Sequence, residues 1–254
     1  MIDPTERFSS RVENYVKYRP GYPKTILALL RRDCGLSPAS VIADIGSGTG
    51  ISSKLFLPNG NRVYGVEPNL EMREAGERLL AKHARFTSVA ATAEATTLPD
   101  TCADFVVAGQ AFHWFDIPAT RAEFNRILKP DGWIVLMWNE RHTSDTLFLR
   151  NFERILKTYC PEYAIVDHRR VDARTLHKFF GRQGFKFAHF DNAQKFDFEG
   201  LRGRLLSSSY APEPGHPNHE PMLAALAAIF TTCQSAGRVT FTYDTQVYYG
   251  QLGK

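Results

Sequence analysis

The sequence predicts an α/β fold with a doubly wound, mostly parallel sheet, and three observations lead to this prediction. Short apolar segments alternate with helical segments along residues 41–139, as in a series of strand-helix units. The first apolar segment, residues 41–45, is continuous rather than alternating, which is typical of a parallel strand covered on both faces. A glycine-rich turn follows it directly. Because parallel connections cross over in the right-handed sense, helices are expected on both faces of the sheet.

Two helices are expected before the first strand. One occupies residues 8–18, because its apolar residues recur at three- and four-residue spacing, and Pro20 ends it. The residues of that apolar face are Phe8, Val12, Tyr15 and Val16. The second helix follows Pro23 and has Gly35 as its C-terminal cap. Its buried side should consist of Ile26, Leu27, Leu29 and Leu30.

Four further strands of the parallel sheet are expected after the glycine-rich turn, each marked by a short apolar segment. They lie at residues 62–67, 84–90, 103–109 and 131–138, with helical segments between them. The helix before the last of these strands should run from about Pro118 to Leu128. It should end at a turn formed by residues 129–132, which contain both proline and glycine.

The last third of the chain shows a different pattern. Residues 185–198 and 239–252 alternate apolar and polar side chains, as in longer strands with unlike faces. A helix is expected between them through Met222, Leu223, Leu226, Ile229 and Phe230. No repeat or obvious linker divides the sequence, so we expect one domain over residues 1–254. Its parts would be a helical arm and first helix at 1–36, a binding core at 41–139, and insertions with the last two strands at 140–254.

Composition and charge argue against several classes of protein. The 254 residues, with 43% hydrophobic and 23% charged content, suffice for one sizeable core. The net charge of +4 is small and the basic residues are scattered, so no nucleic-acid partner is expected. The four cysteines lie far apart without zinc-ligand spacing and are expected to be reduced thiols. The polar start and the lack of a long apolar stretch predict a cytoplasmic protein without membrane contact, and the oligomeric state is not indicated.

The glycine-rich turn and an acid downstream of it indicate a nucleoside site. Gly46, Gly48 and Gly50 let a ligand approach the backbone without meeting a Cβ atom, and exposed amides that lead into a helix attract anionic groups. Glu67 ends the second strand about 20 residues later, where a carboxylate can accept hydrogen bonds from ribose hydroxyls. The third glycine of a dinucleotide motif would fall at Ile51, so that motif fits poorly, and there is no P-loop. A tight turn without a ligand is the alternative interpretation.

Five segments, in this order, resemble the motifs of one enzyme family. They are DIGSGTG (44–50), YGVE (64–67), TAEATTLP (92–99), ADFVVAGQAFHWF (103–115) and LKPDGWIVLMWNE (128–140). Together they resemble the class I S-adenosylmethionine-dependent methyltransferases of the type-11-like branch. The resemblance implies a Rossmann-like, seven-stranded sheet with an antiparallel last strand, and S-adenosylmethionine as cofactor. The flanks YVKYRPGYP (15–23) and SSSYAP (207–212) are similar to those of trans-aconitate-methyltransferase-like enzymes.

The resemblance also implies which residues hold the cofactor. Those for its amino-acid part are Asp44, Gly46, Ser47, Gly48 and Gly50. Those for the ribose and adenine are Glu67, Pro68, Asn69, Met72, Ala93 and Glu94. Gln110 and Ala111 would lie beside the methionyl portion. The family often has Asp before the Ala-Glu pair, whereas this chain has Thr92 at the position that would contact the adenine amino group.

Methyl transfer from a sulfonium is an in-line displacement, which a protein assists by alignment and by excluding water, without a metal. Aromatic faces can hold the sulfonium charge. The candidate aromatic walls are Tyr15, Tyr18, Tyr22, Phe112, Trp114 and Trp138, and each of them could instead be a core residue. His113 could be a general base for a nucleophile that carries a proton, or a structural histidine.

The acceptor is expected to be a small molecule. Arg19 could clamp a carboxylate, and Arg141 and His142 are weaker candidates for that task. Hydroxyl groups from residues 207–209 and Tyr210 could add to the site, although such a serine run is often plain loop. A carboxylate acceptor is the first choice because of the flanks and Arg19. Methylation of RNA or protein, and a non-catalytic cofactor-binding module, are the alternatives.

Two segments are expected to close over the cofactor. Residues 15–23 should join the fold only through a short, proline-limited link, and residues 207–217 should be too rich in proline and polar residues to enter the core. Both are therefore expected to be mobile without ligand. Closure would bring Tyr18, Arg19, Tyr22 and Tyr210 around the acceptor.

Overall fold

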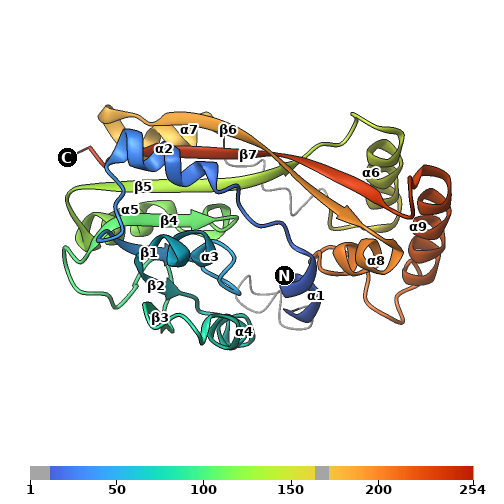
Figure 1. Cartoon of the computed structure of the whole chain (residues 1–254), viewed down its shortest axis with the longest axis horizontal. Coiled ribbons are helices and arrows are strands. Elements are labelled where there is room, and N and C mark those ends of the chain that lie inside the picture. The colour runs from blue at the N-terminus through green and yellow to red at the C-terminus, as the bar shows by residue number, and fades with distance from the viewer. Residues whose placement is uncertain (1–11, 164–171, 254) are drawn as a thin grey trace.

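The computed structural model describes residues 12–163 and 172–253 of the chain (Figure 1). Within these residues one seven-stranded sheet has the order β3-β2-β1-β4-β5-β7-β6. Its strands are β1 (Val41–Ile45), β2 (Arg62–Val66), β3 (Phe86–Val89), β4 (Ala103–Gly109), β5 (Leu128–Arg141), β6 (Lys186–Phe196) and β7 (Val239–Gly250). β1 to β5 pair in parallel, and β7 runs antiparallel to β5 and β6. The predicted fold class is confirmed.

The helices of the described residues follow the predicted order in the first half of the chain. They are α1 (Val12–Tyr18), α2 (Thr25–Cys34), α3 (Ser53–Phe56), α4 (Leu70–Leu80), α5 (Ile117–Ile127), α6 (Leu147–Tyr159), α7 (Ala173–Phe180), α8 (Phe198–Leu206) and α9 (His219–Cys233). Gly35 caps α2 in the left-handed conformation, with φ of 70°, as predicted. Phe8, expected in the first helix, lies outside the described residues. None of α6, α7 and α8 is named individually in the sequence analysis.

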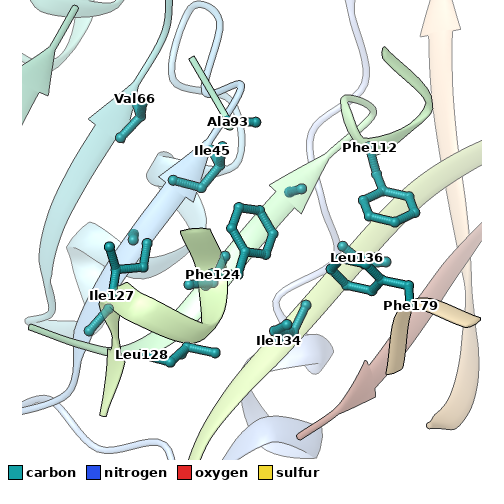
Figure 2. Close-up of a cluster of buried hydrophobic side chains, with 14 of the residues drawn as sticks. Ile45, Val66, Ala93, Phe112, Phe124, Ile127, Leu128, Ile134, Leu136 and Phe179 are labelled. Carbon is teal, nitrogen blue, oxygen red and sulfur yellow. The ribbon is translucent and has the colours of Figure 1, made fainter. Parts of the chain in front are cut away.

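Both faces of the parallel sheet are covered, which explains the continuous apolar character of β1. Ile42 points to one face, where it packs with side chains from α2, α3 and α4. Ala43 and Ile45 pack on the other face with side chains from α5 and α7. Figure 2 shows this second cluster, in which Phe124 of α5 and Phe179 of α7 lie over the strands. Because both faces are covered, a ligand is expected at the carboxyl ends of the strands, as is general for open α/β sheets.

The beginning of β5 differs from its prediction. The turn expected at residues 129–132 is part of the strand, because Ala103 pairs with Leu128 and the register then shifts before Phe105 pairs with Trp133. Residues 129–132 have no paired partner in β4, and Asp131 has a φ of 65°, so the chain turns locally inside the bounds of β5. The predicted turn is therefore an irregular stretch within the strand and not a separate loop before it.

The long antiparallel strands β6 and β7 carry a group of helices away from the parallel sheet (Figure 1). We call this group the cap: it consists of α6, α8 and α9 with residues 193–196 of β6 and 239–243 of β7. The cap has its own hydrophobic cluster, in which Phe241 of β7 contacts Phe148 and Phe152 of α6. The predicted alternation of β7 is confirmed and follows from this packing, because one face of the strand is buried along its length.

Two expectations about the closing segments are wrong. Residues 18–22 do not depend on a proline-limited link alone, because Gln194 donates a hydrogen bond to the Tyr18 carbonyl and Asn192 donates one to the Gly21 carbonyl. Ser207 and Ser208 are 0% and 1% exposed, so the serine run enters the core. The turn there continues the hydrogen bonding of α8, and this satisfies polar groups that the sequence composition placed at the surface.

Candidate active site

Two adjoining cavities lie at the carboxyl ends of β1, β2, β4 and β5. We call them the loop-side cavity, about 160 Å³, and the cap-side cavity, about 150 Å³. The loop-side cavity is bordered by the glycine turn, Glu67 and residues 92–94. The cap-side cavity is bordered by residues from α1, β5 and the cap. The residues that line both are Tyr15, Gly46, Gly48, Gly109, Gln110 and Trp114. Two ligands in these cavities would therefore be in contact.

The turn after β1 is held from β2. The amides of Gly46 and Ser47 both donate to the Val66 carbonyl, at 2.9 and 3.1 Å. Gly46 has a φ of 66°, and a Cβ atom there would lie 2.5 Å from the Ala111 Cβ. Glycine is therefore needed at this position both for its backbone conformation and for the approach of the chain after β4.

Two residues predicted for the cofactor line neither cavity. Asp44 is fully buried and accepts hydrogen bonds from the hydroxyls of Ser52 and Ser53, at 2.6 to 2.9 Å. Burial raises the pKa of Asp44 to about 6, although these hydroxyls act against the rise. Gly50 faces Leu80 of α4, whose Cδ1 would lie 2.5 Å from an added Cβ. The structure places both residues in the support of the turn.

Glu67 is one of two acidic residues that line the loop-side cavity, the other being Glu94. Glu67 is 9% exposed, and its two carboxylate oxygens accept hydrogen bonds from the amides of Gly48 and Asn69, at 2.8 and 2.9 Å. Burial raises the pKa of Glu67, and the two amide bonds oppose that rise. Because each oxygen has a second lone pair, the fixed carboxylate can still accept bonds from a ligand.

Most of the other residues predicted for the cofactor line the loop-side cavity. They are Gly46, Gly48, Pro68, Asn69, Met72, Ala93, Glu94, Gln110 and Ala111, whereas Ser47 lines the cap-side cavity. Thr92 also lines the loop-side cavity. Glu94 accepts hydrogen bonds from the Asp116 amide and, at 3.4 Å, from the Thr120 hydroxyl, so its carboxylate is oriented by the start of α5.

Most residues predicted for the acceptor side line the cap-side cavity: Arg19, Tyr22, His113, Trp114 and Tyr210. Tyr18 does not. Its ring packs against Gly203 of α8, where an added Cβ would overlap it, and lies edge-on to Phe196. Phe112 and Trp138, proposed as aromatic walls, are core residues with 0% and 4% exposure.

The cap-side cavity has two arginines without an acidic partner among the described residues. Arg19 donates a hydrogen bond to the Ser207 carbonyl at 2.9 Å, and its guanidinium lies 5.0 Å from the Tyr15 ring centre. Arg204 of α8 is 8% exposed and donates a long hydrogen bond of 3.5 Å to the Tyr243 hydroxyl. A buried cation without a carboxylate is costly, which favours an anionic ligand beside it.

The local electrostatics support this view. Burial, with the nearby charge of Arg204 as second cause, lowers the pKa of Arg19 to about 10. Burial also acts against the charge of Arg204, but Tyr243 and Tyr210 outweigh it and raise the pKa of that residue. Both arginines therefore stay charged at neutral pH. Arg141, also at this cavity, differs because it forms an ion pair of 2.6 Å with Glu153.

Sequence reasoning missed Arg204 because no motif marks it. One signal was present: Leu201, Arg204 and Leu205 share a helical face at three- and four-residue spacing, so a basic residue stands on an apolar face. Among the described residues, no cluster of three or more His, Cys, Asp or Glu side chains could hold a metal ion.

Comparison with known proteins agrees with this geometry. Residues 43–136 match a family described as a methyltransferase domain. An uncharacterized methyltransferase-like protein of Schizosaccharomyces pombe is 30% identical over 247 residues, which are 95% of this chain and 93% of that protein. The chain belongs to the type-11 branch of the class I S-adenosylmethionine-dependent methyltransferases. S-Adenosylmethionine is the cofactor of this methyltransferase.

Two further comparisons concern the fold and a more distant relative of the methyltransferase. A solved structure from Anaeromyxobacter dehalogenans, described as a type II methyltransferase, has a TM-score of 0.68 at 21% identity and covers 92% of this chain and 98% of its own. This likeness shows the fold. A malonyl-[acyl-carrier protein] O-methyltransferase of Marinomonas is 31% identical over 136 residues, 51% of this chain and 49% of that protein. No described helix of the methyltransferase has the length and apolar character needed to cross a membrane.

Proposed function

We propose that this methyltransferase transfers the methyl group to a carboxylate of a small molecule bound in the cap-side cavity. The observation that carries the proposal is the pair Arg19 and Arg204, two charged guanidinium groups in the cavity wall without acidic partners among the described residues. A carboxylate would satisfy them with charge-assisted hydrogen bonds. The malonyl-[acyl-carrier protein] relative supports this choice, because its name joins O-methylation to a malonyl group, which carries a carboxylate.

The loop-side residues fit the cofactor. Glu67 would accept hydrogen bonds from the ribose hydroxyls, and the backbone around Gly46 and Gly48 would contact the amino-acid part of the cofactor. Pro68, Asn69, Met72, Ala93 and Glu94 would border the adenine, and Gln110 and Ala111 the methionyl portion, which extends toward the cap-side cavity. When bound, S-adenosylmethionine supplies the methyl group to be transferred. Tyr15 and Trp114, which line both cavities, could face its sulfonium charge.

A carboxylate acceptor would need alignment by the protein but no general base. Its oxygen is already a nucleophile at neutral pH, so no proton has to be removed by His113. The arginines would fix the carboxylate in line with the transferred methyl group. Tyr22 would stay a neutral hydrogen-bond donor in the wall, because burial raises the pKa of its phenol well above 10.0.

The free thiols of the four cysteines agree with the location in the cytoplasm that we also propose.

The test is label transfer from S-adenosylmethionine with a labelled methyl group to a panel of small carboxylic acids, with amines and phenols in parallel. Methyl esters hydrolyse in base and release volatile labelled methanol, whereas methylated amines and ethers keep the label. Base-labile label from a carboxylic acid supports the proposal. Label found only in base-stable products, or in RNA or protein, overturns it.

A matched pair of variants links the activity to the cavity. Arg204→Met keeps an unbranched apolar side chain close to the arginine stem and removes the guanidinium charge, and it should lower kcat/KM for the acid about 10- to 150-fold, the range for lost hydrogen bonds to charged groups. Arg202→Met in the same helix is the control, because Arg202 is 46% exposed and lines neither cavity. Equal activity of the two variants would remove the reason for choosing an anion.

A further inference from the structure

Asn139 stands in the wall of the cap-side cavity with its side chain fixed from three sides. It belongs to β5 and is 4% exposed. Its Oδ1 accepts hydrogen bonds from the Thr245 hydroxyl at 2.6 Å and from the Asn192 amide at 3.1 Å. Its Nδ2 donates to the Gly21 carbonyl at 3.2 Å. The adjacent strand β7 and the next strand, β6, thus orient the carboxamide so that its donor faces the N-terminal segment, residues 15–23.

The Gly21 carbonyl is the point where the N-terminal segment meets the sheet. It accepts hydrogen bonds from Nδ2 of both Asn139 and Asn192, the second at 2.9 Å. Gly21 lies between Arg19 and Tyr22, which both line the cap-side cavity. Two bonds to one backbone oxygen therefore set the position of an acceptor-binding guanidinium and a phenol at the same time.

The backbone of Asn139 connects to the cofactor side. Its carbonyl accepts a hydrogen bond from the Gln110 carboxamide at 3.3 Å. Gln110 lines both cavities and has a φ of 56°, a backbone conformation that is uncommon for a residue other than glycine. Observed strain of this kind at a cavity is a sign of a constrained functional position. One residue therefore contacts both the segment that carries Arg19 and the residue between the two cavities.

We propose that Asn139 is a positioning residue for methyl transfer, which sets the distance between the N-terminal segment and Gln110 and so aligns the acceptor with the cofactor. The proposal rests on the proposed function in one respect, the acceptor-binding role of Arg19. The hydrogen bonds themselves need no acceptor. The position of the N-terminal segment and the rate of methyl transfer can therefore be measured separately.

The decisive variant is Asn139→Asp, which keeps the shape and replaces the donor with an oxygen that faces the Gly21 carbonyl oxygen. Asn61→Asp is the matched control, because it makes the same change at a fully buried asparagine whose Nδ2 donates to the Ser37 and Ser40 carbonyls and which lines neither cavity. Asn192→Ala removes one of the two bonds to Gly21 from a partly exposed position, and it serves if Asn139→Asp does not fold.

Three readouts on the full chain separate positioning from general damage. With S-adenosylhomocysteine bound, amide exchange of α1 (Val12–Tyr18) should become at least fivefold faster in Asn139→Asp and change less than twofold in Asn61→Asp. The dissociation constant of S-adenosylhomocysteine should change less than threefold. With whichever acceptor the unmodified enzyme methylates, kcat/KM should fall at least tenfold. Asn192→Ala should show the same pattern with smaller changes.

Each result decides the proposal. Unchanged α1 exchange in Asn139→Asp overturns it, and so does a loss of S-adenosylhomocysteine affinity equal to the loss of kcat/KM, which would indicate a structural role only. If the unmodified enzyme methylates no carboxylic acid, the proposed function fails. The exchange rate of the α1 amides still shows whether Asn139 holds the N-terminal segment. The rate of label transfer to a metabolite extract still shows whether the variant is slower than the unmodified enzyme.

Discussion

Replacing Glu67 with Gln tests the cofactor site with the least change of shape. The carboxylate now accepts one amide bond on each oxygen, from Gly48 and from Asn69. A glutamine has one oxygen, so its amino group must face one of these N–H donors. The variant therefore loses one backbone bond and the charged acceptor that the ribose hydroxyls would use.

The magnitude follows from these contacts. Hydrogen bonds to a charged group contribute about 1.5–3 kcal/mol, so the dissociation constant of the cofactor should rise about 10- to 150-fold. The cost to the folded protein should be smaller than the cost to binding. Burial raises the pKa of Glu67, which means that the charged form is disfavoured before ligand binds, and a neutral amide avoids that penalty.

Calorimetric titration with S-adenosylhomocysteine measures the affinity, and urea unfolding of the free protein measures the stability. Glu74→Gln is the control, because Glu74 is a 54% exposed residue of α4 that pairs with Arg78 and lines neither cavity. If Glu67→Gln binds S-adenosylhomocysteine as tightly as this control while folded, the assignment of Glu67 to the ribose is refuted. A loss of stability without a loss of affinity would make Glu67 a support of the turn only.

Three further predictions concern other parts of the structure. Asp44 should bind its proton more tightly in the folded state than in the unfolded state, because burial raises its pKa to about 6. The free energy of unfolding of the unmodified protein, relative to that of Asp44→Asn, should therefore increase by about 1 kcal/mol as the pH falls from 7 to 5, as measured by urea unfolding. Gly203→Ala should displace the Tyr18 ring and lower the free energy of unfolding by about 1–3 kcal/mol, and Tyr18→Ala in the same chain should recover part of it. His113→Gln should keep kcat/KM for a carboxylic acid within threefold and leave its pH profile unchanged, since no proton has to be removed.

The parallel half of the fold could be predicted because its signals are local. A strand buried on both faces is continuously apolar, and a turn that needs positive φ values and close approach selects glycine, as at Gly46. Glu67 could be located for the same reason, since it directly follows β2, the strand that pairs with β1. These features depend on residues that are near in sequence or repeat a pattern along it.

The acceptor side could be predicted only in part because it depends on distant contacts. Arg19 and Tyr22 were identified, but the bonds that hold their segment come from Asn139, Asn192 and Gln194, more than 115 positions away. Nothing in the local sequence around these three residues shows that they face the N-terminal segment. The same limit applies to Ser207 and Ser208, whose burial follows from the packing of the cap and not from their own composition.

The two cavities therefore differ in what a family relationship can say about them. The match to the methyltransferase domain ends at residue 136, and it includes the glycine turn, Glu67 and Gln110 but neither Arg19, Asn139 nor Arg204. More than half of the residues that line the cap-side cavity lie before or after that match. Cofactor chemistry can thus be carried over from relatives, whereas the choice of acceptor rests first on this chain's own arginines and on the bonds that fix them, and a relative's name only adds support. A relative that aligns with only half of the chain can share the cofactor and still use a different acceptor.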